Sequence, residues 1–450
     1  MTVKTANRDD YAKDVTVRLL DELFCVGGVP QIGVRLWDGA TWPKDRSATA
    51  TVNLNHPGAL RAMFLAGKEV GLAEAYLYDD CDIEGDCEAV FDLSENLAAD
   101  TSGWRVKLRA AKDLLRLPSD DEHPWLKAHG QTLRRGPANL SGRRHSVERD
   151  RQAISFHYDV SNDFYALWLD RRMVYSCAYF RSPEEDLDAA QTNKLDYICR
   201  KLRLQPGQRL LDIGCGWGAL VNHAAEHYGV EATGITLSEP QARLANERIK
   251  AAGLQDRCRV LVSDYREVAE EGAYDALASV GMFEHVGEAL LSTYFRRAHE
   301  LLKPGGVFLN HGIVRRATDT PYAGRSFTDT YVFPDGELMP IGITLKTAEE
   351  AGFEIRDVES LREHYAMTLR HWVRRLETAH DAALKYVEEP TYRVWRLYMS
   401  GSAHGFARGR LNVYQALLTK PGARGRSGLP LTRADWYLEQ AREKPEIAKK

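Results

Sequence analysis

Apolar residues follow one pattern at the start of the chain and a different pattern after Ser155. In the first part, short stretches of alternating apolar and polar residues, such as 33–39 and 49–54, lie between turns rich in Gly and Asp. This alternation is typical of short strands in a small α+β domain. We therefore predict a smaller N-terminal α+β domain in residues 1–130.

The region after Ser155 alternates apolar runs with stretches of helical period. The runs predict strands at 209–213, 232–236, 259–262, 276–280 and 307–310, and the stretches between them predict helices at 219–228, 239–252 and 290–302. A near-continuous apolar run indicates a strand buried on both faces, as in a parallel sheet covered by helices. We therefore predict an α/β fold with a doubly wound, mostly parallel sheet in residues 153–420.

The segment from Thr101 to Leu117 has the spacing of an amphipathic helix. One face carries Trp104, Leu108, Ala111 and Leu115, and another carries Arg105, Arg109, Lys112 and Arg116. Two interpretations stay open. The helix either packs on its own domain with solvated basic side chains, or lies on an anionic membrane surface.

Two further segments show no periodicity. Residues 131–152 concentrate Arg134, Arg135, Arg143 and Arg144 and are predicted to be a basic linker. Such a linker is either simply solvated or attracts acidic lipid headgroups. Residues 421–450 are polar, and we expect them to form a peripheral C-terminal tail.

Composition and charge exclude several classes of protein. With 44% hydrophobic and 28% charged residues the chain is not disordered, and its net charge of -4 argues against a nucleic-acid partner. No apolar run reaches the roughly 18 residues needed to cross a bilayer, and the start of the chain lacks the order of a secretory signal. We expect a cytoplasmic protein. The seven cysteines form no CxxC pair, so neither structural disulfides nor a metal site are expected.

A glycine-rich loop, Leu-Asp-Ile-Gly-Cys-Gly-Trp-Gly at 211–218, follows a predicted strand and precedes a predicted helix. In that position glycines let the backbone approach a ligand at a helix N-terminus. A dinucleotide oxidoreductase would place an acidic residue at the end of the next strand, but that strand ends in Gly-Ile-Thr-Leu-Ser at 234–238. The acids are instead Asp212 in the loop segment and Asp264 after the third strand, before Tyr265 and Arg266. This placement argues against a dinucleotide cofactor, and Asp212 is either a cofactor ligand or a loop-capping residue.

The glycine loop, the 234–238 segment and the acid closing the third strand resemble class I S-adenosylmethionine-dependent methyltransferases. Four further motifs narrow the resemblance: His-Tyr-Asp-Val-Ser-Asn-Asp-Phe at 157–164, Val-Tyr-Ser-Cys-Ala-Tyr-Phe at 174–180, Ser-Val-Gly-Met-Phe-Glu-His-Val-Gly at 279–287 and Asn-His-Gly-Ile at 310–313. Together they resemble the cyclopropane-fatty-acyl-phospholipid synthase and mycolic acid synthase family, over about Ser155 to Leu418. The resemblance implies a seven-stranded, Rossmann-like sheet and an S-adenosyl-L-methionine cofactor.

In that family a methyl carbon is transferred to the cis double bond of an acyl chain, and the resulting carbocation loses a proton to a bound bicarbonate. The resemblance assigns the catalytic roles to Cys177, Glu284, His311, Ile313 and Tyr365. It assigns cofactor binding to Tyr175, Ser176, Asp212, Gly214, Cys215, Gly216, Trp217, Gly218, Thr236, Leu237, Ser238, Gln241, Asp264, Tyr265 and Arg266. Without the motifs, Cys177, His311 and Tyr365 would each read as an ordinary buried residue.

Two positions depart from the family pattern or extend beyond it. Family members often have a cysteine once proposed as a nucleophile before an Ala-x-x-Phe segment, where this chain has Ser402. A covalent cysteine mechanism therefore has no support there. Glu148 lies just upstream of the catalytic domain, and it either enters the site as a base or is a solvated linker residue beside Arg149.

The resemblance leaves the product open. Loss of the proton gives either a cyclopropane ring or an exocyclic methylene group, and a methylene product implies a partner reductase. A non-catalytic lipid- or cofactor-binding protein is the third class considered, and the intact catalytic set argues against it. The N-terminal module resembles that of the full-length bacterial synthases, which implies unsaturated phospholipid acyl chains as substrate, peripheral association with the inner face of an anionic membrane, and a homodimer.

Overall fold

The structure, a computed structural model, describes residues 2–24, 32–44, 48–65, 69–92, 104–119, 123–130, 136–158, 160–319 and 325–437. By contact, the chain forms two compact units. The first comprises 1–138, 322–332 and 380–404, and the second comprises 139–321, 333–379 and 405–450. Two segments from within the predicted catalytic range, 322–332 and 380–404, thus group with the N-terminal residues.

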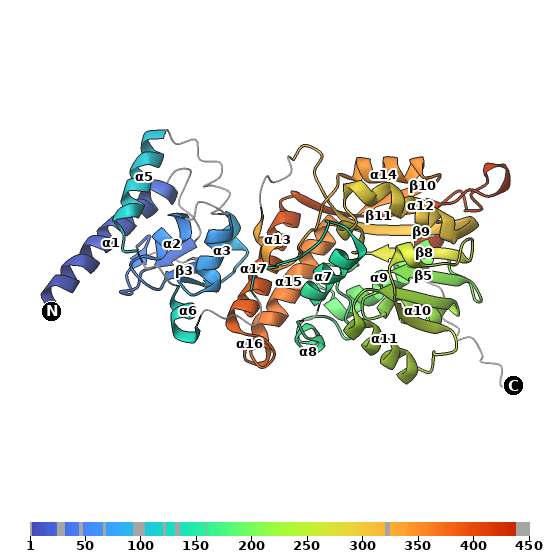
Figure 1. The fold of residues 1–450 in the computed structure, drawn as a ribbon, viewed down its shortest axis with the longest axis horizontal. Helices are drawn as coiled ribbons and strands as arrows, with labels where there is room; N and C mark the ends of the chain where they lie inside the picture. Colours follow the sequence, from blue (N-terminus) through green and yellow to red (C-terminus); the bar gives the residue numbers. More distant parts are fainter. Residues whose placement is uncertain are drawn as a thin grey trace. The chain divides into compact units, whose positions relative to one another are not determined.

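The first unit is an α+β structure around a four-stranded sheet (Figure 1). Its strands run in the order β2 (Thr41–Trp42), β1 (Ile32–Arg35), β3 (Ala50–Leu54) and β4 (Cys81–Gly85). Its helices are α1 (Thr2–Phe24), α2 (Ala59–Leu65), α3 (Glu69–Leu77), α5 (Trp104–Arg116), α6 (Pro124–His129), α13 (Phe327–Tyr331), α16 (His380–Ala383) and α17 (Glu389–Ala407) up to His404. Arg393 and Arg396 of α17 donate to the backbone carbonyls of Tyr76 in α3 and Ile83 in β4. These bonds attach α17 to elements from the N-terminal part of the chain.

The second unit is built on a seven-stranded sheet. The strand order is β10 (Glu354–Ser360), β11 (Leu411–Thr419), β9 (Leu302–Arg315), β8 (Tyr274–Val280), β5 (Arg209–Ile213), β6 (Glu231–Thr236) and β7 (Cys258–Val262). Strands β5 to β9 are parallel, and β11 joins β9 and β10 by antiparallel pairing. The predicted α/β class and seven-stranded, mostly parallel sheet are confirmed.

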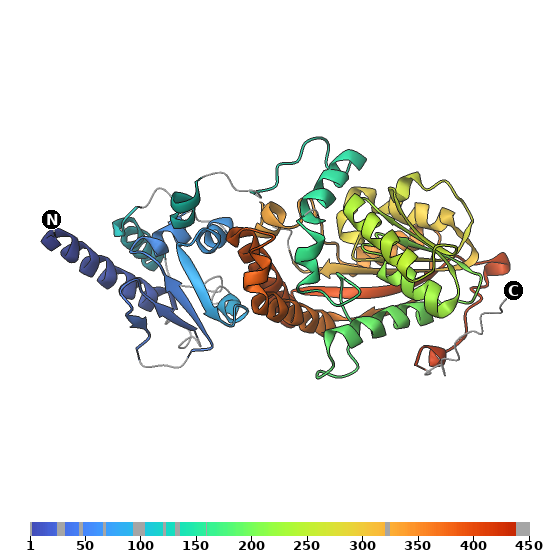
Figure 2. The same cartoon turned by 90° about the horizontal axis from the view of Figure 1, so that it is seen from below.

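Helices cover both faces of this sheet (Figure 2). Apolar side chains of α9 (Leu187–Lys201), α10 (Ala219–Tyr228) and α11 (Glu239–Ala251) form the core on one face. Those of α12 (Leu291–Leu301) and α14 (Ile341–Glu350) form the core on the other. The chain reverses its direction of strand addition at β5, which lies between β6 and β8, and parallel sheets bind ligands outside the strand ends at such a point.

Local sequence signals place most elements of the second unit well. Strand β5 and helix α10 have the predicted bounds, but β9 spans Leu302–Arg315 and extends beyond both ends of the predicted strand at 307–310. Helix α7 (Val147–Tyr158) begins inside the segment predicted to be a linker. The reason lies in Ser146, whose Oγ accepts from the Arg149 N–H as a helix-capping residue does. Residues 131–135 lie outside the described residues.

The prediction that the whole C-terminal tail is peripheral is wrong for its first part. Trp436 in α18 (Ala434–Tyr437) is buried in the core formed by α9 and α10, and Asp435 pairs with Arg203. A single tryptophan in a polar stretch supplies enough apolar surface to dock the segment. Residues 438–450 lie outside the described residues.

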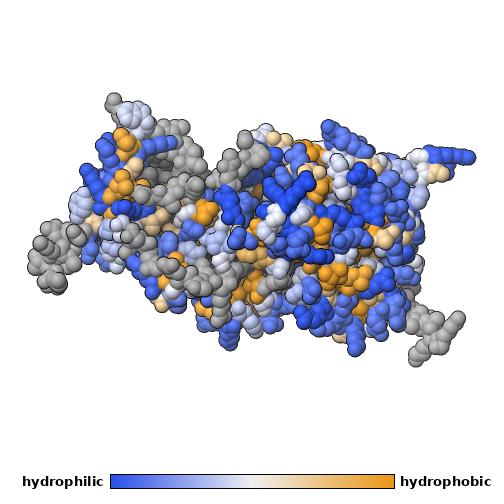
Figure 3. Space-filling view, viewed as in Figure 1, coloured by the Kyte–Doolittle hydropathy of each residue, from blue (hydrophilic) through white to orange (hydrophobic). Residues whose placement is uncertain are grey.

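The surface seen in Figure 3 is mostly polar, with apolar residues in separate patches. One patch lies over α5. The helix search, made over the described part of the chain, finds none long and apolar enough to cross a membrane.

Candidate active site

The glycine loop joins β5 to α10 at the carboxyl end of the sheet. Gly214, Gly216 and Gly218 have φ values of +81, +54 and +78°, a left-handed conformation that side chains disfavour. A Cβ on Gly214 would lie 2.7 Å from the Cβ of Met282. The glycines therefore keep this loop tight and leave its backbone open to a ligand.

Beside the loop, buried polar atoms lack partners within the described residues. Asp212 is 3% exposed, its Oδ1 accepts no hydrogen bond, and burial raises its pKa to about 7. Gln241 accepts from the Thr236 hydroxyl through Oε1 at 2.8 Å, but its Nε2 has no partner. A ligand that carries both an ammonium and an acceptor satisfies such a pair. The amino-acid end of S-adenosylmethionine fits this requirement.

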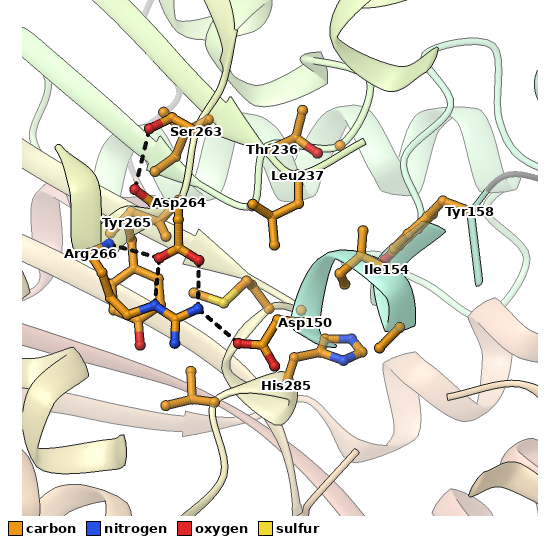
Figure 4. A pocket seen from close by; sticks show the side chains of 18 of the residues that line it. Asp150, Ile154, Tyr158, Thr236, Leu237, Ser263, Asp264, Tyr265, Arg266 and His285 are labelled. Carbon is orange, nitrogen blue, oxygen red and sulfur yellow. Dashed lines mark hydrogen bonds and ion pairs between the residues drawn. The ribbon is translucent and has the colours of Figure 1, made fainter. Parts of the chain in front are cut away.

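A second part of the cavity lies beyond the ends of β6 and β7 (Figure 4). There the Arg266 guanidinium donates to both oxygens of Asp264, at 2.7 and 2.6 Å, and to Asp150 of α7 at 2.8 Å. These ion pairs fasten α7 over the cavity. Tyr158 and His285 lie on the same side of this cavity as Asp150.

Thirteen of the predicted cofactor residues line these two parts of the cavity: Tyr175, Ser176, Asp212, Gly214, Cys215, Gly216, Trp217, Thr236, Leu237, Gln241, Asp264, Tyr265 and Arg266. The other two, Gly218 and Ser238, support the site from behind. Gly218 faces Ala245, and Ser238 caps α11 by accepting from the Gln241 N–H. The Trp217 indole donates to Asn162 Oδ1 at 2.8 Å, which fixes helix α8 (Asn162–Ala166) beside the loop.

Lys194 also lines the cavity, and the motifs did not predict it. It is 2% exposed, and its Nζ donates to Ser176 Oγ at 2.9 Å. A signal was present in the sequence. Lys194 and Lys201 fall among the buried residues of α9, where a lysine is unusual unless it has a specific partner. Asp150 of α7 was missed because the segment up to residue 152 was predicted to be a linker, and Ile154 was missed because it belongs to none of the motifs.

The predicted catalytic residues begin with Glu284, in the short helix η2 (Phe283–His285) after β8. Its Oε1 accepts from the Ile313 N–H at 2.6 Å, while its buried Oε2 has no partner among the described residues. Burial raises the pKa of this carboxyl to about 7. The structure thus holds a carboxylate by one oxygen and leaves the other free to accept a hydrogen bond.

His311 lies on β9, two residues before Ile313, and is 1% exposed. Its Nδ1 lies 3.2 Å from Gln415 Nε2, and its Nε2 has no partner within the described residues. Burial lowers its pKa to about 3, so the imidazole is neutral near neutral pH. Glu284 is thus hydrogen-bonded to the Ile313 N–H, two residues along β9 from His311, and these three residues form one group where β8 ends beside β9.

Cys177 and Tyr365 meet at the start of α15 (Arg362–Thr378). The Leu361 carbonyl accepts from Tyr365 N–H and lies 3.6 Å from Cys177 Sγ. Val413 of β11 connects the two groups, because its carbonyl accepts from Leu361 and it pairs in register with Ile313. Burial raises the pKa of the Cys177 thiol, so this cysteine is a weak hydrogen-bonding group and not a thiolate nucleophile.

A wall of aromatic rings runs from Tyr175, which lines the cavity, through Trp372 to Tyr365. The Tyr175 ring lies 5.2 Å from that of Trp372 and 5.6 Å from that of His157, whose ring stacks on Phe333 at 3.8 Å. Trp372 in turn contacts the ring of Tyr365. Aromatic faces attract cations, so this wall suits a reaction that develops positive charge.

The structure places Glu148 and Ser402, the two positions that depart from the family pattern or extend beyond it. Glu148 is exposed on α7 and does not line either part of the cavity. Ser402 lies on α17 within the first unit, whereas all five predicted catalytic residues belong to the second.

A family model described as mycolic acid cyclopropane synthetase matches residues 145–416, more than half of the chain. The chain belongs to this family. It is 41% identical over 407 residues to a "Probable fatty acid methyltransferase" of Pseudomonas putida, covering 90% of this chain and 95% of that protein. It is 39% identical over 413 residues to "Probable fatty acid methyltransferase Rv3720" of Mycobacterium tuberculosis, covering 91% and 96%.

Solved structures agree with this assignment. The cyclopropane synthase MmaA2 from Mycobacterium tuberculosis matches with a TM-score of 0.57 and 34% identity, over 60% of this chain and 97% of that one. The mycolic acid cyclopropane synthase CmaA1 complexed with SAH and CTAB also matches with a TM-score of 0.57 and 34% identity, over 60% of this chain and 97% of that one. The predicted enzyme class is therefore confirmed, and members of this family of methyltransferases use S-adenosylmethionine as the methyl donor.

Proposed function

We propose that the protein transfers a carbon from S-adenosylmethionine to the cis double bond of an unsaturated phospholipid acyl chain and closes a cyclopropane ring. The observation that carries the proposal is the group formed by Glu284, Ile313 and His311, beside an aromatic wall. A buried carboxylate with one free oxygen, together with a neutral imidazole two residues along β9 from its backbone partner Ile313, suits removal of a proton from a buried cation.

Each group has a defined task in this reaction. When bound, S-adenosylmethionine supplies an electrophilic methyl group. Asp212 and Lys194 hold its charged amino-acid end, and α7 closes over the adenosine part of the cavity. Tyr175, Trp372 and their aromatic neighbours stabilise the cation that forms on the acyl chain as its double bond takes up the methyl group.

The donor set fits a bicarbonate as the base. Glu284 Oε2 is an acceptor for the hydroxyl of bicarbonate, and His311 Nε2 is a buried group with no partner among the described residues. The Cys177 thiol adds a weak hydrogen-bonding group, and the Tyr365 phenol adds a hydroxyl that can donate or accept. Because bicarbonate has a hydroxyl, it can lie beside the Glu284 carboxylate without direct repulsion between two charged oxygens. The Ile313 N–H holds Glu284 itself and orients it for this contact.

A second product is supported by the relatives. The two that match over about nine tenths of both chains are named probable fatty acid methyltransferases, and a third, 37% identical over 290 residues, is named tuberculostearic acid methyltransferase UfaA1. Both products arise from the same cation, which loses its proton either with ring closure or with formation of an exocyclic methylene. The second outcome places a reductase after this enzyme.

Incubation with S-adenosylmethionine and vesicles of a mono-unsaturated phosphatidylglycerol tests the proposal. We expect the released fatty acids to gain one CH2 by mass spectrometry and to show high-field ring protons by NMR. Vinylidene protons would identify the methylene product instead. No gain in mass with cofactor binding intact would contradict a phospholipid acyl chain as the acceptor.

We propose that α5 places the protein on an anionic membrane surface. The apolar face predicted for this helix is exposed: Trp104, Leu108 and Leu115 have 70, 49 and 57% exposure, while Ala110 and Leu114 on the other face are buried. Basic side chains flank the exposed stripe, which is the arrangement of an interfacial helix.

Serine at both Trp104 and Leu108 is therefore expected to weaken binding to anionic vesicles by about tenfold or more, because each large apolar side chain contributes roughly 2 kcal/mol when buried. Vesicle sedimentation measures the effect, and Leu431→Ser, at a 99% exposed leucine of the second unit, is the control. High salt should release the wild-type protein. Equal binding of the double variant would contradict a role for α5.

The rate should depend on the protonation of Glu284. Its pKa is raised to about 7 by burial, so the carboxylate is present above that pH and is lost as the pH falls through it. We expect kcat at saturating cofactor to fall on the acid side with an apparent pKa near 7, and not near that of an ordinary glutamate. His311, with a pKa of about 3, adds no step in this range. A kcat that stays constant down to about pH 5 would contradict the role of Glu284.

A further inference from the structure

Three polar residues lie side by side across the antiparallel end of the large sheet. Glu359 of β10 pairs in register with Gln415 of β11, and Gln415 pairs in register with His311 of β9. Residues paired in this way share one face of a sheet. Gln415 is fully buried, and His311 is 1% exposed.

Lys201, at the end of α9, completes the row. Its side chain is fully buried, and Nζ donates to Gln415 Oε1 at 2.9 Å and to Glu359 at 2.5 Å. Asp357 lies 3.6 Å from the same Nζ. Two carboxylates therefore keep the ammonium charged, although burial alone lowers the pKa of this lysine.

The donors and acceptors in this row have only one consistent arrangement. An ammonium only donates, so the Gln415 atom that faces Lys201 is the oxygen, and the amide NH2 faces His311. An amide NH2 also only donates, so His311 Nδ1 must carry a lone pair. The proton of the neutral ring is then on Nε2. Turning the Gln415 amide would place its NH2 against the Lys201 ammonium, and turning the imidazole would leave the NH2 facing a ring carbon in a buried site.

We propose that Lys201 and Gln415 are positioning residues that hold His311 as the neutral tautomer protonated on Nε2. His311 then acts as a hydrogen-bond donor to the anion beside Glu284 and never as the group that removes the proton. This inference rests on the proposed function for its catalytic consequence, but the tautomer itself is a property of the folded protein. Neither the family motifs nor the cavity includes Lys201 or Gln415.

Substitutions at Gln415 and Lys201 separate this role from simple packing. In Gln415→Glu, the carboxylate accepts from Lys201 and also from His311, which moves the ring proton to Nδ1 and removes the donor at Nε2. We expect kcat to fall about 10²-fold, as for loss of one donor to a developing anion, with the KM for S-adenosylmethionine within about twofold. Lys201→Met should free the amide to turn and lower kcat, whereas Lys201→Arg should restore it.

The direct test is 15N NMR of the full chain labelled at histidine, with the His311 signals identified by their loss in His311→Gln. We expect wild type to show an unprotonated Nδ1 and a protonated Nε2 from about pH 6 to about pH 8. Gln415→Glu should show the reverse, a protonated Nδ1 and an unprotonated Nε2. Thr419→Val is the matched control, because Thr419 is a buried residue of β11 on the same face whose hydroxyl donates to Gly306 and not to this row.

A wild-type His311 that is protonated on Nδ1, or that titrates near neutral pH, would overturn the proposal. Wild-type kcat in Gln415→Glu, or equal kcat in Lys201→Met and Lys201→Arg, would also overturn it. The NMR measurement needs no turnover. A protein with the expected tautomer but no activity on acyl chains would therefore contradict the proposed function and leave this inference standing.

Discussion

Replacing Glu284 with glutamine is expected to lower kcat about 10³-fold while S-adenosylmethionine binds within about twofold of wild type. The glutamine keeps the size and an oxygen for the Ile313 N–H, but it has no charge to accept the proton of a bound bicarbonate or of the substrate cation. Because Glu284 does not line the cofactor cavity, binding of the cofactor should be unchanged.

Single-turnover product formation and calorimetric binding measure the two effects separately. Glu288→Gln is the control, since Glu288 follows on the same segment and is exposed. The Glu284→Gln variant should be folded, because the glutamine replaces a carboxyl that lacks a partner on one oxygen. Turnover within tenfold of wild type would show that Glu284 does not take part in the proton transfer.

Replacing Asp212 with asparagine is expected to weaken cofactor binding and leave kcat nearly unchanged, the opposite of the effect of Glu284→Gln. A hydrogen bond to a charged group contributes about 1.5–3 kcal/mol, so S-adenosylmethionine should bind about 10- to 100-fold more weakly. At saturating cofactor, kcat should change little because the Glu284 and His311 group is intact. Calorimetry with S-adenosylmethionine measures the loss, and Asp256→Asn, at an exposed site before β7, is the control.

The same substitution should stabilise the protein without its cofactor. The folded-state pKa of Asp212 is raised to about 7, above its unfolded value, so wild type loses stability as the pH rises through that range. Asparagine removes this contribution. The Tm difference between variant and wild type should therefore grow from about pH 5 to about pH 8. Unchanged affinity, or a lower Tm at high pH, would contradict a cofactor-binding role for an uncompensated buried carboxylate.

The sequence predicted the elements whose cause is local. β5 is a short, mostly buried run that ends at the glycine loop, and α10 is bounded by glycines, so both have the predicted limits. The docked Trp436 was missed because its burial depends on distant partners. Helix α7 has a local start signal in Ser146, and a distant partner holds it over the cavity. Asp150 pairs with Arg266, and the Trp436 ring packs against α9.

The residues of the candidate site divide in the same way, into those that a local motif identifies and those that depend on distant partners. Motif residues such as Asp212 and Glu284 could be found because the glycine loop and the strand ends bring them together in any protein of this fold. Lys194, Lys201 and Gln415 carry no motif, and their meaning depends on pairing across α9 and β11. Two lysines among the buried residues of α9 were the one available signal, and this helix was not predicted from the sequence.

The most direct test of the account uses S-adenosylmethionine with a trideuterated methyl group and mono-unsaturated phosphatidylglycerol vesicles. The account predicts that the acyl chain gains a CD2 unit in a ring, because the base removes one deuteron from the transferred carbon. Glu284→Gln should form none. Retention of all three deuterons would contradict proton removal from the transferred carbon, and no transfer to acyl chains despite bound cofactor would contradict the proposed function.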